Sequence, residues 1–119
     1  MKTKTSELTG AALDWAVAKC EGKTDGELVT HDEFYWDGEG LQWAIEYTPS
    51  TNWSQGGPII EREKLILGYI GEIWECRYFD EGKFKNCEYG PTPLIAAMRC
   101  FVTSRLGEEV EVPDELLGE

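Results

Sequence analysis

The stretch from residue 48 to residue 63, TPSTNWSQGGPIIERE, combines side chains suited to holding a small ligand. Trp53 offers a flat surface on which a planar group can stack, and Gly56 and Gly57 let the backbone approach a ligand closely. Short polar side chains surround them and supply hydrogen-bond donors and acceptors. With the tyrosine that precedes the stretch, the candidate ligand contacts are Tyr47, Ser50, Thr51, Trp53, Gln55, Gly56 and Gly57. The pattern is typical of a loop that holds a base with its ribose or phosphate, and an ordinary surface loop has the same composition.

A helix start that favours anions follows in the segment YGPTPLIAAMRCF. Thr92 is a good N-cap, Pro93 suits the first helical position, and the start of a helix presents unpaired N–H groups and positive dipole charge. Arg99 is expected to point back toward Thr92 and to add a charge-assisted contact. We therefore expect the loop from Tyr47 to Glu63 to pack over this helix start, forming one pocket for a phosphate-like group. An ordinary capped helix with Arg99 in a surface ion pair fits the same residues.

Patterns for catalysis and metal binding are weak. His31, the one histidine, lies in an acidic stretch without a nucleophile motif. Glu61 and Glu63 have the chemistry of an acid/base pair, but charged surface residues look the same. The cysteines are too scattered for a zinc site and are expected to be buried or half-buried thiols: Cys20, Cys76, Cys87 and Cys100. A non-catalytic protein without metal or cofactor is favoured over an enzyme.

The charge of the chain is strongly negative. There are 23 acidic and 11 basic residues, which gives a formal net charge of −12. Such a surface repels phosphate backbones, so direct binding of nucleic acid is not expected. One interpretation is a protein that meets a basic host protein, with Glu108, Glu109 and Glu111 in the contact. The other is that the charge maintains solubility.

The hydrophobic pattern predicts one α+β domain over residues 1–119, a small, mostly antiparallel β-sheet packed on one face by two α-helices. The helices are expected at 9–21 and 93–106, and strands at 41–48, 63–70, 72–79 and 84–89. Residues 1–7 and 113–119 are expected to be loosely ordered tails. Trp15, on the second face of the first helix, and the aromatic strands predict a homodimer. No apolar run is long enough to span a membrane, and no signal peptide is evident, so a cytoplasmic location is expected.

Three blocks of the chain resemble the NinX family of phage proteins. They are LTGAALDWAVAKCEG, YTPSTNWSQGGPIIERE and YGPTPLIAAMRCFVTSRLGEEVEVP. The likeness runs from about Leu8 to Pro113 and is specific because the blocks are long, although residues 64–89 carry no signature of the family. The members are small proteins of unknown function in tailed phages and prophages. The resemblance implies a phage accessory protein in the bacterial host cytoplasm, and it carries over no catalytic or binding residue.

Three classes of function follow from these observations. The first is a binder of a small anionic, nucleotide-like ligand, in the form of a counter-defence sponge that sequesters a host signalling nucleotide. The second is an acidic interaction module that targets a basic host protein, either as an inhibitor or as a mimic. The third is an enzyme. A retained small molecule, a co-purified host protein and turnover of a nucleotide panel would select the first, second and third class respectively.

Overall fold

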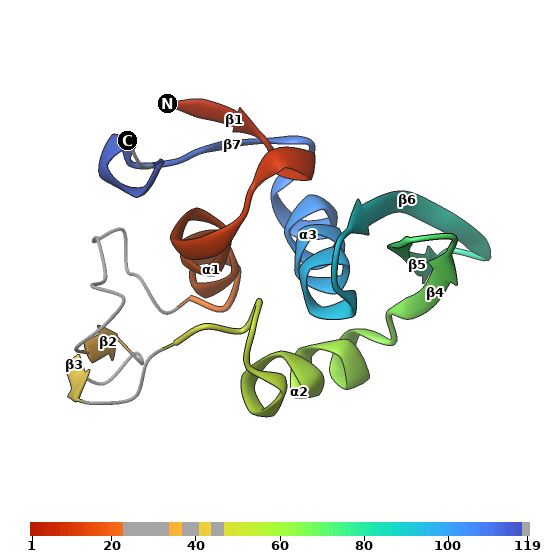
Figure 1. Cartoon of the computed structure of the whole chain (residues 1–119), viewed down its shortest axis with the longest axis horizontal. Coiled ribbons are helices and arrows are strands. Elements are labelled where there is room, and N and C mark those ends of the chain that lie inside the picture. The colour runs from red at the N-terminus through yellow and green to blue at the C-terminus, as the bar shows by residue number, and fades with distance from the viewer. Residues whose placement is uncertain (23–33, 37–40, 44–46, 118–119) are drawn as a thin grey trace.

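A computed structural model of the protein describes residues 1–22, 34–36, 41–43 and 47–117. Helix α3 (Pro93–Leu106) runs through the middle of the fold, as Figure 1 shows. Helix α1 (Gly10–Cys20) packs on one side of it and a three-stranded antiparallel sheet packs on the other. The predicted α+β class is confirmed, and the structure adds a third helix, α2 (Trp53–Glu63), which crosses the end at which α3 begins.

Helix α3 forms because its start and stop signals are strong. The Thr92 hydroxyl accepts a hydrogen bond from the N–H of Ile95 at 3.1 Å, Pro93 takes the first position, and Gly107 ends the helix with φ +91°. A helix that is apolar on all sides belongs in the interior of a fold. The buried residues of α3 accordingly surround its axis: Leu94, Ala96, Ala97, Met98, Cys100, Phe101, Val102 and Thr103.

Helix α1 presents the face that its spacing predicts. Leu13, Ala16 and Val17 are completely buried, and Trp15 is partly buried against the same core. Thr9 occupies the N-cap position, although its side chain makes no capping bond in the structure. Gly22, with φ +74°, lies just after the helix, as is common for a glycine that follows a helix end.

The three-stranded sheet is a meander of β4 (Ile66–Ile70), β5 (Ile73–Asp80) and β6 (Lys83–Gly90), in that order. Gly71 and Gly82 adopt positive φ in the two turns that join the strands. Successive side chains point to opposite faces of a strand. The face that meets α3 carries Leu67, Trp74, Cys76 and Tyr78, all of which pack against the core.

Segments near the two ends of the chain pair with one another, and they include residues 2–4 of the tail expected at 1–7. Strand β1 (Lys2–Lys4) pairs antiparallel with β7 (Glu109–Glu111), and short 3-10 helices follow each of them at Thr5–Glu7 and Asp114–Leu116. The register opposes Lys2 to Glu111 and Lys4 to Glu109. Opposite charges that face one another across two strands contribute roughly 0.2–1 kcal/mol per pair. The local sequence at either end does not reveal this pairing.

A second small ribbon pairs β2 (Phe34–Trp36) with β3 (Leu41–Trp43), antiparallel. The turn between these strands and His31 lie outside the described residues. So do residues 44–46 of the strand expected at 41–48. In the described part of the chain, no helix is both long and apolar enough to cross a membrane.

The segment from Trp53 to Glu63 is helical, so the prediction of a loop over 48–63 is wrong from residue 53 onward. Two glycines and Pro58 disfavour a helix by about 1 kcal/mol for each glycine and about 3 kcal/mol for an interior proline. Two local features oppose them. Asn52 caps the helix by accepting a hydrogen bond from Ser54 N–H at 2.9 Å, and Ile59 is buried in the core. Tertiary packing therefore overrides local propensity here.

Candidate functional site

A pocket of about 210 Å³ lies where the segment before α2 meets the start of α3. Four of the residues expected to contact a ligand line it: Ser50, Thr51, Trp53 and Thr92. Pro93, Leu94 and Ile95 complete the wall and make it largely apolar. The expected meeting of the two segments is thus present in the fold. The volume is below the roughly 300–1,000 Å³ of pockets that enclose a drug-sized ligand, so it suits a single ring system.

Hydrogen bonds hold the segment before α2 in one conformation. The N–H of buried Ser50 donates to Asp14 Oδ1 of α1 at 2.9 Å. The N–H of Thr48 donates to the side chain of Gln55 at 2.6 Å, and the Thr48 carbonyl accepts from Thr51 and Asn52. Gln55, one of the expected ligand contacts, is therefore engaged in shaping the turn.

The hydroxyl of Ser50 is the polar atom in this pocket that most needs a partner. Ser50 is only 2% exposed, and its Oγ has no hydrogen-bond partner among the described residues. Leaving a buried hydroxyl unsatisfied costs about 1–3 kcal/mol. Helix geometry also provides no intrahelical acceptor for the first-turn N–H groups of Trp53 and Leu94, which belong to lining residues. The starts of two helices thus meet at the pocket, together with Ser50, whose hydroxyl has no partner within the described ranges.

The role of Gly56 and Gly57 in the structure differs from the expected contact with a ligand. Both lie within α2, and the Gly56 N–H donates to the Asn52 carbonyl at 2.8 Å. A Cβ on Gly56 would lie 2.5 Å from the Pro49 carbonyl oxygen and 2.6 Å from Leu94 Cδ2. Gly56 therefore permits close packing of α2 on α3, and the backbone amides of this pair do not form a ligand cradle.

Arg99 lies away from the pocket. Its Nε donates to the Leu8 carbonyl at 2.9 Å and its terminal nitrogen donates to the Tyr89 carbonyl at 2.7 Å, so the guanidinium holds two backbone carbonyls and does not line the pocket. Burial lowers the pKa of Arg99. Tyr47 packs against the core, where burial raises the pKa of its phenol. Neither residue lines the pocket, and none of the lining residues is basic.

The acid/base pair considered from the sequence takes a different form in the fold. Glu63 accepts hydrogen bonds at 2.8 Å from both Arg62 and Arg105. Burial acts to raise the pKa of Glu63, but the two arginines lower it on balance. Glu63 thus belongs to an ion-pair network, and Glu61 is exposed. In residues 1–22, 34–36, 41–43 and 47–117, no group of three His, Cys, Asp or Glu side chains is arranged to hold a metal ion.

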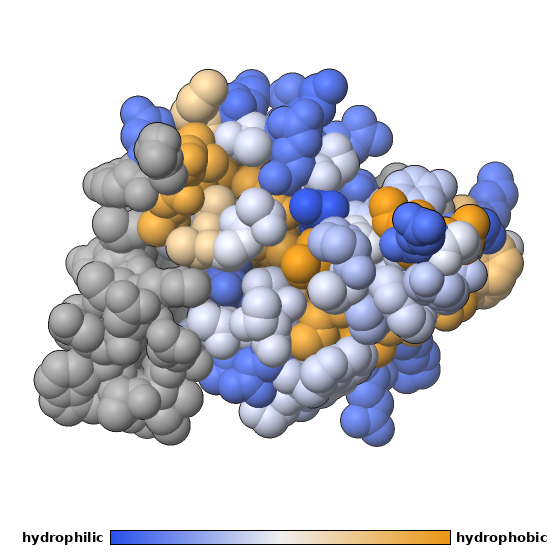
Figure 2. All heavy atoms as spheres, viewed as in Figure 1, coloured by the Kyte–Doolittle hydropathy of each residue, from blue (hydrophilic) through white to orange (hydrophobic). Residues whose placement is uncertain are grey.

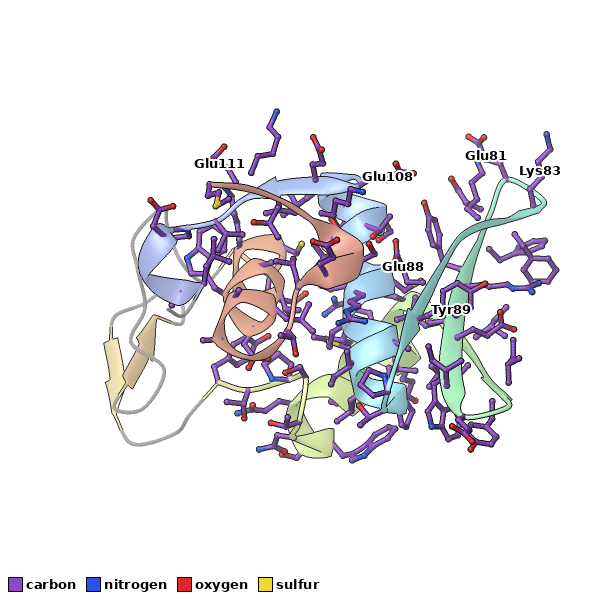
Figure 3. The ribbon with its side chains drawn as sticks, turned by 45° about the horizontal axis from the view of Figure 1, so that its top comes forward. Glu81, Lys83, Glu88, Tyr89, Glu108 and Glu111 are labelled. Carbon is purple, nitrogen blue, oxygen red and sulfur yellow. The ribbon has the colours of Figure 1, made fainter. Side chains whose placement is uncertain are left out.

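A separate cleft of about 430 Å³ is acidic and contains Glu108 and Glu109, two of the glutamates expected to meet a basic partner, together with Glu88, which was not expected there. Its lining residues are Lys4, Ser6, Glu88, Glu108 and Glu109. Figure 3 shows Glu88 and Glu108 near the same end of α3. Buried Glu88 accepts a 2.9 Å hydrogen bond from the Thr103 hydroxyl, and burial raises its pKa. The strand register sets Glu88 opposite the core residue Cys76, a pairing that has no local signature in the sequence.

Comparison with known proteins agrees with the sequence blocks. A search among curated proteins finds no match. The family model described as "Bacteriophage P22, NinX" matches residues 4–105, which includes α1, α2, the three-stranded sheet and nearly all of α3. The match covers most of the chain and extends through the middle region, 64–89, where no signature was noted. The chain therefore belongs to the NinX family of phage proteins.

Proposed function

We propose that this protein is a non-catalytic binder of a small, planar, nucleotide-like ligand, held in the pocket between the segment before α2 and the start of α3. Ser50 lines the pocket, and its buried hydroxyl has no hydrogen-bond partner among the described residues. This observation carries the proposal, because a polar edge of a ligand can supply the missing partner. Trp53 is 55% exposed, lines the same pocket and supplies the stacking surface.

The pocket offers weaker interactions to an anionic group of the ligand than to its planar ring system. The first-turn N–H groups of α2 and α3 favour an anion through the helix dipole, each by roughly 0.3–1 kcal/mol at an exposed site. No arginine or lysine lines the pocket, and buried Asp14 is bonded directly to the Ser50 backbone. We therefore assign most of the binding free energy to the ring system and a smaller share to a phosphoryl group.

A stoichiometric binder of this kind acts by sequestration. In a phage accessory protein working in the host cytoplasm, the corresponding role is a counter-defence sponge that lowers the free concentration of a host signalling nucleotide. Native mass spectrometry of the protein purified from phage-challenged bacteria tests this role, because a bound nucleotide survives as a defined mass increment. Recovery of only ligand-free protein contradicts it.

Substitution at Ser50 provides the sharper test of the pocket. Ser50→Ala removes a hydroxyl that has no partner in the described part of the chain, so the ligand-free variant should be as stable as wild type or more stable. The same variant should bind nucleosides and nucleoside 5′-monophosphates several-fold more weakly in isothermal titration calorimetry. A Ser104→Ala variant is the matched control, because its hydroxyl bonds to the Phe101 carbonyl at 2.7 Å and does not line the pocket. Equal binding by wild type and Ser50→Ala argues against the pocket.

The acidic cleft supports a second candidate, an interaction module for a basic host protein. Its three carboxylates belong to Glu88, Glu108 and Glu109, and the chain as a whole carries a formal net charge of −12. Glu109 also approaches Lys2 at 4.0 Å, so part of the acidic surface is neutralised internally. Replacing Glu108, Glu109 and Glu111 by glutamine should weaken capture of a basic partner steeply at low salt. Unchanged capture removes this candidate.

A further inference from the structure

The outer face of the three-stranded sheet is open and apolar. One face of the sheet packs on α3, so alternation turns every second side chain of β4, β5 and β6 away from the core. Figure 2 shows hydrophobic residues at the surface on the right, where Figure 1 places β4, β5 and β6. The large apolar residues on this face are Ile66, Ile70, Ile73, Phe79, Phe84 and Tyr89, and each is at least 39% exposed.

The exposed apolar surface of this face is as large as patches that mark interaction sites. Six half-exposed side chains of this size present on the order of 500 Å², and contiguous apolar patches above a few hundred Å² mark interaction sites. A standard interface buries about 800 Å² per partner. The apolar residues together with their polar rim supply an area of that order.

The charge of the face selects its partner. Most of the surface of this chain repels a second copy, because the net charge is −12. The charged residues at the centre of the outer face are Glu75 and Arg77 on β5, which balance one another and approach at 3.4 Å. This is a neutral region on which two strongly acidic molecules can meet.

We propose that the outer face of the β4–β5–β6 sheet binds the same face of a second copy of the chain. The two-fold axis lies between the two sheets, perpendicular to the strands, and passes midway between Glu75 and Arg77. It therefore sets Glu75 opposite Arg77 of the partner subunit. The same axis sets Ile73 opposite the partner subunit's Phe79. The result is a two-layered β-sandwich of six strands with its sheets about 10 Å apart. This proposal is independent of the ligand pocket.

Sedimentation velocity across a concentration series tests the dimer. Wild type should reach twice the 13.5 kDa monomer mass, and Phe79→Glu should raise the dissociation constant about thirtyfold or more, because it replaces a large aromatic contact by a charge. Leu117→Glu is the control, an exposed apolar residue that lies outside the sheet. Because Phe79 is 56% exposed, its replacement should leave circular dichroism and Tm of the monomer close to wild type.

A charge exchange identifies the partner as a second copy. Arg77→Glu gives a face with two negative residues and Glu75→Arg gives one with two positive residues, so each variant alone should remain monomeric. Their equimolar mixture should form a heterodimer, because every cross-interface pair is then opposite in sign. A monomeric wild type at all concentrations overturns the proposal, as does a dimer that neither Phe79→Glu nor Arg77→Glu weakens.

Discussion

Gly56 of α2 and Leu94 of α3 approach so closely that a methyl group on Gly56 would lie 2.6 Å from Leu94 Cδ2. The same methyl group would meet the Pro49 carbonyl oxygen, which belongs to the backbone and cannot rotate away. Gly56→Ala should therefore lower the free energy of unfolding by about 1–3 kcal/mol, the usual range for overpacking. Chemical denaturation with equilibrium fluorescence measures the change.

Gly57→Ala is the matched control for this substitution. Gly57 lies in the same helix, and the nearest atom to an added Cβ is in the Trp53 ring at 3.9 Å, an ordinary contact. Alanine should therefore raise stability by about 0.5–1 kcal/mol through helix propensity alone. Equal effects of the two substitutions would mean that α2 does not pack as described.

Arg99→Ala should destabilise the ligand-free protein. The guanidinium joins the Leu8 carbonyl to the Tyr89 carbonyl, and hydrogen bonds from a charged group are each worth about 1.5–3 kcal/mol. The exposed Lys83 at the hairpin tip, labelled in Figure 3, gives a control in which the loss of a positive charge should leave Tm nearly unchanged. An Arg99→Ala variant with wild-type Tm would show that the two carbonyls do not need this side chain.

Glu88→Gln should stabilise the protein at neutral pH. Burial raises the pKa of Glu88, so the folded state binds a proton more readily than the unfolded state. The penalty for holding Glu88 ionised is absent below the unfolded pKa of about 4.3 and grows as pH rises through the folded pKa. The difference in Tm between Glu88→Gln and wild type should be positive at pH 7 and should shrink toward pH 4. A difference that is constant with pH would mean that Glu88 is fully solvated.

Three thiols should resist alkylation in the folded protein. Cys76 and Cys100 are completely buried, and Cys20 is partly buried. A hydrogen bond with Cys76 together with burial raises the pKa of Cys100, and burial raises the pKa of Cys20 to about 12. Peptide mass spectrometry after iodoacetamide treatment should show little modification of these three until denaturant is added. Rapid native labelling of Cys100 would contradict the described core.

Sequence reasoning succeeded where one local signal decided the structure. Thr92, Pro93 and Gly107 fixed the bounds of α3, and the β-rich runs on either side of Gly71 gave β4 and β5. It failed where distant packing decided. The glycines and Pro58 in α2 read as a loop, because the buried contact of Gly56 with Leu94 has no local signature. The two predicted segments do meet in the fold, whereas the hydrogen bonds of Arg99 were not predicted because their acceptors, the Leu8 and Tyr89 carbonyls, lie on other elements.

The pairing of β1 with β7 has a consequence for the order in which the protein folds. The Thr5 hydroxyl bonds to the Gly107 carbonyl across 102 residues of chain, whereas β4, β5, β6 and α3 meet their neighbours along the sequence. Loop-closure entropy rises with the logarithm of the loop length, so the pairing of the ends is entropically the most demanding contact. Strands β1 and β7 should assemble on an already folded sheet and α3. In native-state hydrogen exchange, their amides should open before those of β5 and α3, leaving the remaining fold intact.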